Sequence, residues 1–248
     1  MKQFNKVAPI TLLFWLMKVV ATTLGETLGD FISMTLHYGY IVGLAITSAL
    51  LMIALLVQYY AKEYKPAKYW FVIIGTTTLG TEISDFIDRT LHMGYLYGSI
   101  LLAACLMVSL LIWYRTYKNL EVYPIFEKKK EMLFWTAVLF SNSLGTAFGD
   151  FLSDNLGLSY LHGAMVTGSI IILVVLLHYF TKLNHILLFW IAFIFTRPFG
   201  ATFGDFLTKP FAKGGLELNT LYASLCSVFL MMIMIALAHK RKPGEQLT

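Results

Sequence analysis

Four aspartates at equivalent places are the residues of this hydrophobic chain best suited to do chemistry. Each is followed by phenylalanine and preceded by two small residues that lie four positions apart. The aspartates are Asp30, Asp85, Asp150 and Asp205, and the small residues are Gly25 and Gly29, Gly80 and Ser84, Gly145 and Gly149, and Gly200 and Gly204. Small residues at this spacing let two helices approach closely within a membrane, whereas a charged side chain at the centre of a membrane helix costs roughly 2.5–3.5 kcal/mol. The pattern therefore predicts acids that bind an ion or hold helices together.

Polar residues precede each acid at helical spacing, so each helix should carry one polar face. These positions hold Lys18, Thr22 and Glu26 before Asp30, Thr77 and Thr81 before Asp85, Asn142 and Thr146 before Asp150, and Arg197 and Ala201 before Asp205. Glu82 widens the second face. Four such faces are too polar to contact lipid, so we expect them to converge on a central cleft. At about 1.5 Å per residue, the acids should lie near its outer mouth.

The predicted cleft contains more acids than bases, because the four aspartates, Glu26 and Glu82 face only Lys18 and Arg197. Protons or a metal ion would balance the excess negative charge, since clustered carboxylates cannot all stay ionised. Oxygen ligands suit Mn²⁺, Mg²⁺, Ca²⁺ or protons better than soft metals, and no other cofactor is expected. We therefore expect the aspartates to bind the ion, Glu26 and Glu82 to add charge or carry a proton, and Lys18 and Arg197 to act as gates or counter-ions.

Two other functions use the same residues. Lys18 and Arg197 would attract a small anionic substrate if the aspartates were structural. A membrane scaffold or accessory subunit would use the acids only to hold helices together. An enzyme is not expected, because the chain lacks a phosphate-binding glycine loop, a Cys-x-x-Cys pair and a Ser/His pair within the predicted spans.

Composition and hydropathy predict an all-α membrane protein. Hydrophobic residues make up 58% of the 248 residues and charged residues only 13%. Eight apolar stretches reach spanning length, at about 8–31, 38–60, 67–87, 94–116, 131–152, 160–181, 185–207 and 219–239. The expected partners are therefore membrane lipid and a small ion or small-molecule substrate, and an oligomer is compatible with this class.

Lysines and arginines predict the orientation. Fourteen of the nineteen lie at the N-terminus, in the connections after the second, fourth and sixth stretches, and in the C-terminal tail. Because positive residues favour the cytoplasmic side, both termini should be cytoplasmic in a multi-pass protein. The net charge of +5 then follows from topology and anionic lipid, without a nucleic-acid partner.

The spacing of the aspartates predicts internal repeats. Successive acids are 55, 65 and 55 residues apart, and an aromatic pair ends fifteen positions before each, at Trp15, Trp70, Trp135 and Trp190. We expect one transmembrane domain of four two-helix repeats, at about 7–62, 63–118, 130–182 and 183–240, with a short cytoplasmic link at 119–130. The repeats should be related by an axis along the membrane normal, with acid-bearing helices inside and aliphatic helices outside. The tryptophans are expected to anchor the membrane interfaces.

This layout resembles a family of bacterial repeat-containing inner-membrane proteins with tandem Gly-x-x-x-Gly-Asp-Phe helices. The resemblance covers nearly the whole chain and implies the fold and a location in the bacterial inner membrane, but no catalytic residues. A weaker similarity is to cation/proton exchangers with a Glu-x-Gly-Asp motif. Here the first repeat reads Glu26-Thr-Leu-Gly29-Asp30, one residue longer, and the other repeats lack a matching glutamate.

Overall fold

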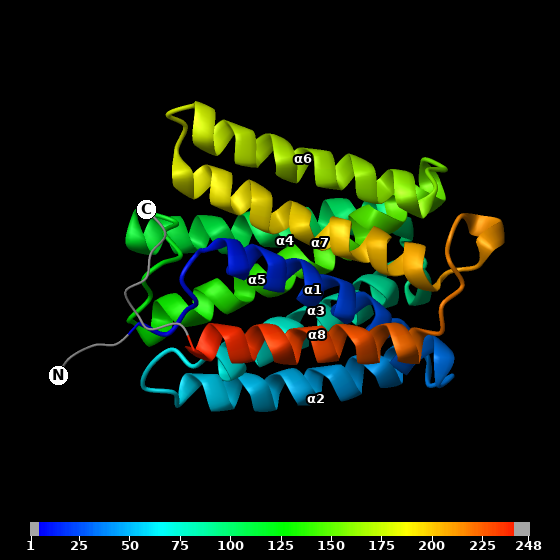
Figure 1. The fold of residues 1–248 in the computed structure, drawn as a ribbon, viewed down its shortest axis with the longest axis horizontal. Helices are drawn as coiled ribbons and strands as arrows, with labels where there is room; N and C mark the ends of the chain where they lie inside the picture. The colour runs from blue at the N-terminus through cyan, green and yellow to red at the C-terminus, as the bar shows by residue number, and fades with distance from the viewer. Residues whose placement is uncertain (1–4, 241–248) are drawn as a thin grey trace.

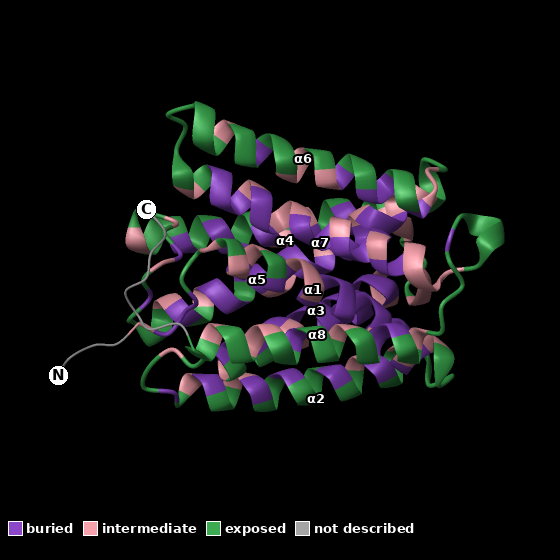
Figure 2. Cartoon of the chain, viewed as in Figure 1, coloured by how far each residue is buried: buried purple, intermediate pink, exposed green. Residues whose placement is uncertain are grey.

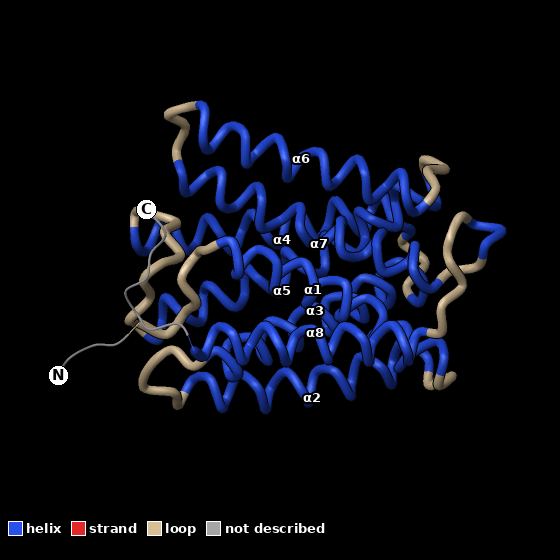
Figure 3. The backbone as a smooth tube through the Cα atoms, viewed as in Figure 1, coloured by secondary structure: helices blue, strands red, loops and turns tan. Residues whose placement is uncertain are grey.

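The computed structural model describes residues 5–240, which form a bundle of eight long α-helices running along the molecule (Figure 1). The helices are α1 (Leu12–Asp30), α2 (Gly39–Tyr59), α3 (Pro66–Asp85), α4 (Gly94–Tyr117), α5 (Lys128–Asp150), α6 (Tyr160–Phe180), α7 (His185–Thr208) and α8 (Thr220–Lys240). Their connections lie at the two ends of the bundle, and residues 5–240 contain no β-strand (Figure 3). The all-helical prediction is therefore confirmed. Part of the predicted cytoplasmic charge, at residues 1–4 and 241–248, lies outside the described residues.

Local sequence explains where several helices begin. The hydroxyl of Thr11 accepts a hydrogen bond from the backbone N–H of Phe14, and Ser159 and Asn184 cap α6 and α7 in the same way. Such caps satisfy backbone donors that have no partner within the helix. At α3 the first residue is Pro66, which lacks an N–H and suits a first helical position.

Three of the four aspartates are followed at once by a π-helical turn. These turns are η1 (Phe31–Thr35), η2 (Phe86–Thr90) and η3 (Phe151–Asn155). In the fourth repeat α7 stays α-helical to Thr208, and a short 3₁₀ turn, η4 (Phe211–Lys213), follows. π-Helical turns are rare and are frequent at functional sites. The Asp-Phe pair thus marks where three inner helices change geometry.

The four acid-bearing helices form a closed inner ring in which α1 packs on α3, α3 on α5, α5 on α7 and α7 on α1. At each contact the first glycine of the motif faces a residue of the next inner helix. The pairs are Gly25 with Thr77, Gly80 with Asn142, Gly145 with Arg197 and Gly200 with Thr22. A Cβ atom built on Gly200 would lie only 2.2 Å from Thr22 Oγ1, so the last helix closes on the first through a contact that requires glycine.

Each outer helix covers the inner helix of the following repeat. α2 packs on α3, α4 on α5, α6 on α7, and α8 returns to pack on α1. The two helices of one repeat therefore contact each other little, because the turn after each inner helix carries the chain to the neighbouring repeat. Figure 2 shows the buried residues concentrated in the inner helices, while α2, α6 and α8 are largely exposed.

Six of the described helices are long and apolar enough to cross a membrane: α1, α2, α4, α6, α7 and α8. This content indicates a multi-pass membrane protein, and the six helices correspond to six of the eight predicted spans. α3 and α5, which carry many polar residues, are not among these six helices. Much of that polarity is buried against other helices, including Thr76, Thr77, Thr81 and Glu82 on α3 and Ser141, Asn142 and Thr146 on α5.

Aromatic side chains fill the end of the inner ring away from the aspartates. Trp70, Trp135 and Trp190 are only 1%, 6% and 4% exposed, and Trp70 packs on Phe14 of the first repeat. The expectation of interfacial anchors is therefore wrong for these three tryptophans, because they turn inward and pack on other aromatic side chains, whereas Trp15 is half-buried. The inner ring has an aromatic end and a polar end.

Candidate functional site

A fully buried arginine occupies the middle of the inner ring. Arg197, on α7, has 0% exposure, and its Nη2 donates to Glu26 Oε2 of α1 at 2.9 Å. The same atom donates to Thr81 Oγ1 at 2.6 Å and to Thr146 Oγ1 at 2.5 Å, so α3 and α5 also supply acceptors. A buried charge is tolerated when it is paired and hydrogen-bonded. Arg197 therefore ties the four inner helices together.

Lys18 lies nearer the aromatic end and is also 0% exposed. Its Nζ donates to Asn142 Oδ1 at 2.9 Å and lies 4.2 Å from the centre of the Phe193 ring. Asn142 in turn donates to Thr76 Oγ1 at 3.1 Å. Within residues 5–240 no carboxylate forms an ion pair with Lys18. Of the two expected counter-ions, Arg197 therefore pairs with a carboxylate, Glu26, whereas Lys18 does not.

Two of the four buried aspartates are bridged by Arg89. This residue lies in η2, and its Nε is 3.3 Å from Asp85 Oδ1 while its Nη2 is 3.2 Å from Asp150 Oδ2. The guanidinium also donates to the hydroxyl of Tyr40 at 2.8 Å and to that of Tyr95 at 3.2 Å. Arg89 is therefore held from four helical elements and has little freedom to leave the two carboxylates.

The other two aspartates are bridged by Lys209, the first residue after α7. Its Nζ donates to Asp30 Oδ2 and lies 3.3 Å from Asp205 Oδ1. Besides these carboxylates, the Met34 sulfur is the only acceptor for it within residues 5–240, at 3.9 Å. Burial lowers the pKa of Lys209, but the Asp205 and Asp30 carboxylates raise it well above its usual value, so the amine stays charged.

The structure places two more cations, Arg89 and Lys209, beside the acids than the sequence analysis predicted. The prediction that Lys18 and Arg197 alone face the acids is wrong, because each pair of aspartates has its own cation. The sequence signal for both is a base four residues after an aspartate, a spacing that places the two side chains on one helical face. Only the second and fourth repeats carry that base.

A group of three carboxylates could hold a metal ion. Glu26, Asp30 and Asp205 are buried, and each offers one oxygen such that the three atoms lie within 4.8 Å of one another. Ligands on opposite sides of Ca²⁺, at 2.3–2.6 Å from the ion, are about 5 Å apart. The three side chains come from α1 and α7, so their spacing fits a hard cation held between the first and last inner helices.

Glu82 faces an outer helix. Its side chain is 0% exposed, and its carboxylate lies against Gly43 of α2, where an added Cβ would be 2.6 Å from Oε2. Neither oxygen has a hydrogen-bond partner within the described chain. Of the two predicted glutamates, the structure therefore groups only Glu26 with the aspartates Asp30 and Asp205.

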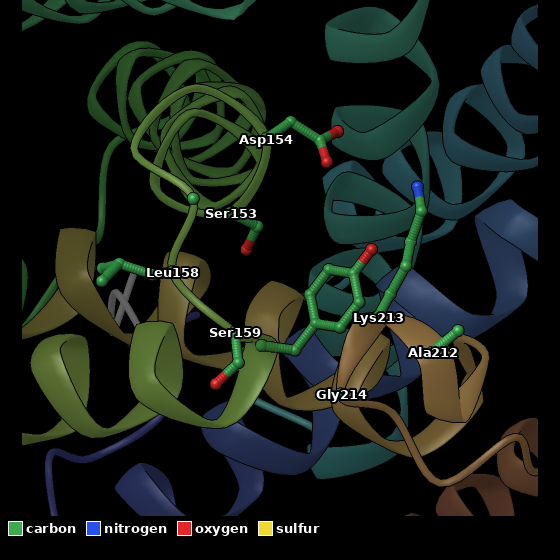
Figure 4. A pocket seen from close by; sticks show the side chains of 9 residues that line it. Ser153, Asp154, Leu158, Ser159, Ala212, Lys213 and Gly214 are labelled. Carbon is green, nitrogen blue, oxygen red and sulfur yellow. The ribbon is translucent and has the colours of Figure 1, made fainter.

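The open central cleft expected from the sequence is filled at the level of Arg197, whose side chain reaches across the ring. A cavity of about 420 Å³ lies instead beside the ring, between the segment 153–160 and the turn 212–214 (Figure 4). Asp154 and Lys213 are among its lining residues. This cavity lies at the aspartate end, because its two segments follow Asp150 and Asp205.

Comparison with known proteins yields one family. A model described as a Repeat of Unknown Function (DUF347) matches four tandem segments, residues 13–64, 68–119, 133–184 and 188–243. No curated protein and no solved structure matches the chain. The four matched segments each contain one inner and one outer helix, in agreement with the repeats expected from the sequence.

Proposed function

The chain belongs to the family of the Repeat of Unknown Function (DUF347), and on that premise we propose that it is a multi-pass membrane transporter for a cation. The ion would bind Glu26, Asp30 and Asp205. The observation that carries this proposal is a positive charge already held there, because the Lys209 ammonium lies between Asp30 and Asp205. Carboxylate oxygens that already surround a positive charge are also the ligands that hard cations such as Ca²⁺ or Mn²⁺ take.

The proposed membrane arrangement follows from the ring. We infer that α3 and α5 cross the membrane with the six apolar helices, because their polar residues are covered by neighbouring helices rather than by lipid. Four repeats in the same sense would then be related by an axis along the membrane normal. The lysine-rich connections would place the aromatic end toward the cytoplasm of a bacterial inner membrane and the aspartate end outward.

The alternative of an anionic substrate is not favoured. Arg197 would be its natural ligand, but its Nη2 already donates to Glu26, Thr81 and Thr146. Binding an anion there would leave Glu26 as an unpaired buried charge, which is strongly unfavourable. We therefore propose that Arg197 holds the inner helices together next to the ion site, on its side toward the aromatic end.

A structural role is the second candidate function, and it is favoured for two of the four aspartates, Asp85 and Asp150. Arg89 holds Asp85 and Asp150 and is itself held by two tyrosines, as expected of a fixed link between helices. If all four aspartates serve only such links, the protein is a scaffold or accessory subunit. The two aspartate pairs can therefore be tested against each other.

Thermal unfolding of the purified protein tests the proposal. A cation that binds the folded state raises its stability, by about 2.7 kcal/mol at a hundred times its dissociation constant. We expect Mn²⁺ or Ca²⁺ to raise the unfolding temperature, and Asp30→Asn to abolish that increase. Asp85→Asn, which removes the same charge from the Arg89 pair, is the matched control and should retain it. A wild-type protein that no cation stabilises would support the scaffold instead.

A further inference from the structure

The two bridging cations differ in how firmly they are held. Arg89 donates to two tyrosine hydroxyls as well as contacting its aspartates. The Lys209 ammonium contacts two aspartates and a weakly accepting sulfur, and its side chain is 20% exposed. Lysine is also a point charge on a flexible stem, whereas arginine makes a planar, directional fork. Lys209 is therefore the cation of the site that can leave.

Backbone hydrogen bonds hold the main chain of Lys209 in place on both sides of its side chain. Its N–H donates to Asp205 O at 2.8 Å, and its carbonyl accepts from the N–H of Glu217 at 3.0 Å. Withdrawal of the ammonium therefore requires only rotation about the side-chain bonds, without rearrangement of α7. Side-chain rotation of this kind is fast compared with movements of whole helices.

The position of the Lys209 ammonium changes the net charge of the site. Glu26, Asp30 and Asp205 carry three negative charges when ionised, and Arg197 supplies one positive charge. A bound divalent ion would neutralise the remainder, whereas an empty site would keep two uncompensated charges. Lys209 halves that excess whenever it occupies the site. Uncompensated charge in a low-dielectric interior is strongly unfavourable. A carrier without bound ion should therefore change conformation more easily when Lys209 occupies the site than when the site holds no cation.

We propose that Lys209 is a tethered substitute for the transported cation. Its ammonium occupies the space between Asp30 and Asp205 when the site is empty and leaves when a metal ion binds. The empty carrier can then return across the membrane, and the protein performs net transport rather than obligatory exchange. This inference rests on the proposed function and adds how the empty site is neutralised.

Net flux and exchange of Mn²⁺ in proteoliposomes separate the two modes of transport. In Lys209→Met we expect net Mn²⁺ uptake into empty vesicles to fall at least about tenfold, because the returning site then carries one more uncompensated charge. Exchange of external tracer for internal Mn²⁺ should persist, since the loaded site needs no lysine. Lys213→Met, which removes the same charge from the same connection, is the control and should preserve both fluxes. Equal loss of net flux and exchange, or no loss of either, would overturn the role of Lys209.

A second measurement uses the wild-type protein and does not depend on the variant folding. Acylation of Lys209 by an amine-reactive probe, followed by mass spectrometry, should become faster when Mn²⁺ saturates the site, while acylation of Lys213 should not change. An unchanged rate at Lys209 in a protein that transports Mn²⁺ would refute displacement. Absence of both net flux and exchange in the wild type would instead reject the proposed function, and this inference with it.

Discussion

Arg197 shows how one residue shapes the centre of the molecule. One turn beyond Arg197, α7 carries Ala201, where the equivalent positions of the other inner helices carry Glu26, Thr81 and Thr146. The small alanine leaves room for the guanidinium, which reaches forward to all three of those side chains. The polar stripes expected from the sequence thus converge, but on an arginine rather than on open space.

Removal of Arg197 should be severely destabilising. Arg197→Met leaves Glu26 buried without its partner, and losing one member of a buried ion pair typically costs about 3–5 kcal/mol. The double variant Arg197→Met/Glu26→Gln removes both charges and should recover much of that loss. Denaturant unfolding of the three proteins measures the difference. A double variant no more stable than the single one would show that the Glu26 charge is not the cause.

Removal of Lys18 should not destabilise the protein, in contrast to removal of Arg197. Lys18 is buried without a carboxylate partner, so Lys18→Met should maintain stability or raise it by about 1–3 kcal/mol. Lys6→Met is a matched control, because Lys6 pairs with buried Glu131 at 2.9 Å and its loss should destabilise. Unfolding midpoints of both variants provide the comparison. A large loss on changing Lys18 would mean that its bond to Asn142 outweighs the cost of burial.

At the residue scale the sequence predicted which side chains are buried polar groups but not how they pair. The aspartates and the residues four and eight positions before them are all buried, as their periodicity indicated. The partners Arg89 and Lys209 were missed, because Arg89 lies in a π-helical turn and Lys209 lies just beyond a helix. Each base lies four residues after an aspartate, but that spacing does not fix the direction of a side chain in or beyond a turn as it does within an α-helix.

At the scale of elements, the glycine motifs determine how the inner helices meet. Gly200→Ala places a methyl group 2.2 Å from Thr22 Oγ1 and 2.8 Å from the Thr22 backbone, so α7 and α1 must separate. We expect a loss of about 1–3 kcal/mol, as is typical of overpacking. Gly75→Ala is the control, because its added Cβ would lie 3.2 Å from the mobile end of Leu51. Equal unfolding temperatures for the two variants would argue against ring closure through Gly200.

The helices themselves were the most predictable elements. Their lengths and approximate bounds follow from apolar stretches and turn residues. Three of the aspartates are the last residues of their α-helices, and Asp205 lies in the last turn of α7. The packing of each outer helix on the next repeat was not predictable, because an aliphatic helix such as α2 or α6 carries no pattern that selects one neighbour over another. The inward position of Trp70 and Trp190 followed from that same three-dimensional arrangement.

At the scale of the whole molecule, the aromatic and polar ends predict a fixed orientation. A cysteine replacing exposed Leu156, at the aspartate end, should react with a membrane-impermeant thiol reagent in intact cells. A cysteine replacing Lys129, at the opposite end, should react only after permeabilisation, because lysine-rich connections favour the cytoplasm. Both variants need Cys105 and Cys226 replaced first. The reverse labelling pattern would invert the proposed topology.

The central claim is that the carboxylates joined by α1 and α7 carry a cation across the membrane. Uptake of Mn²⁺ by proteoliposomes tests it most directly, with Asp205→Asn compared with Asp150→Asn, an identical change in the pair that Arg89 holds. We predict uptake above protein-free vesicles for the wild type and for Asp150→Asn, and its loss in Asp205→Asn. Uptake that is absent from the wild type, or that both variants lose equally, would contradict a transport site at Glu26, Asp30 and Asp205.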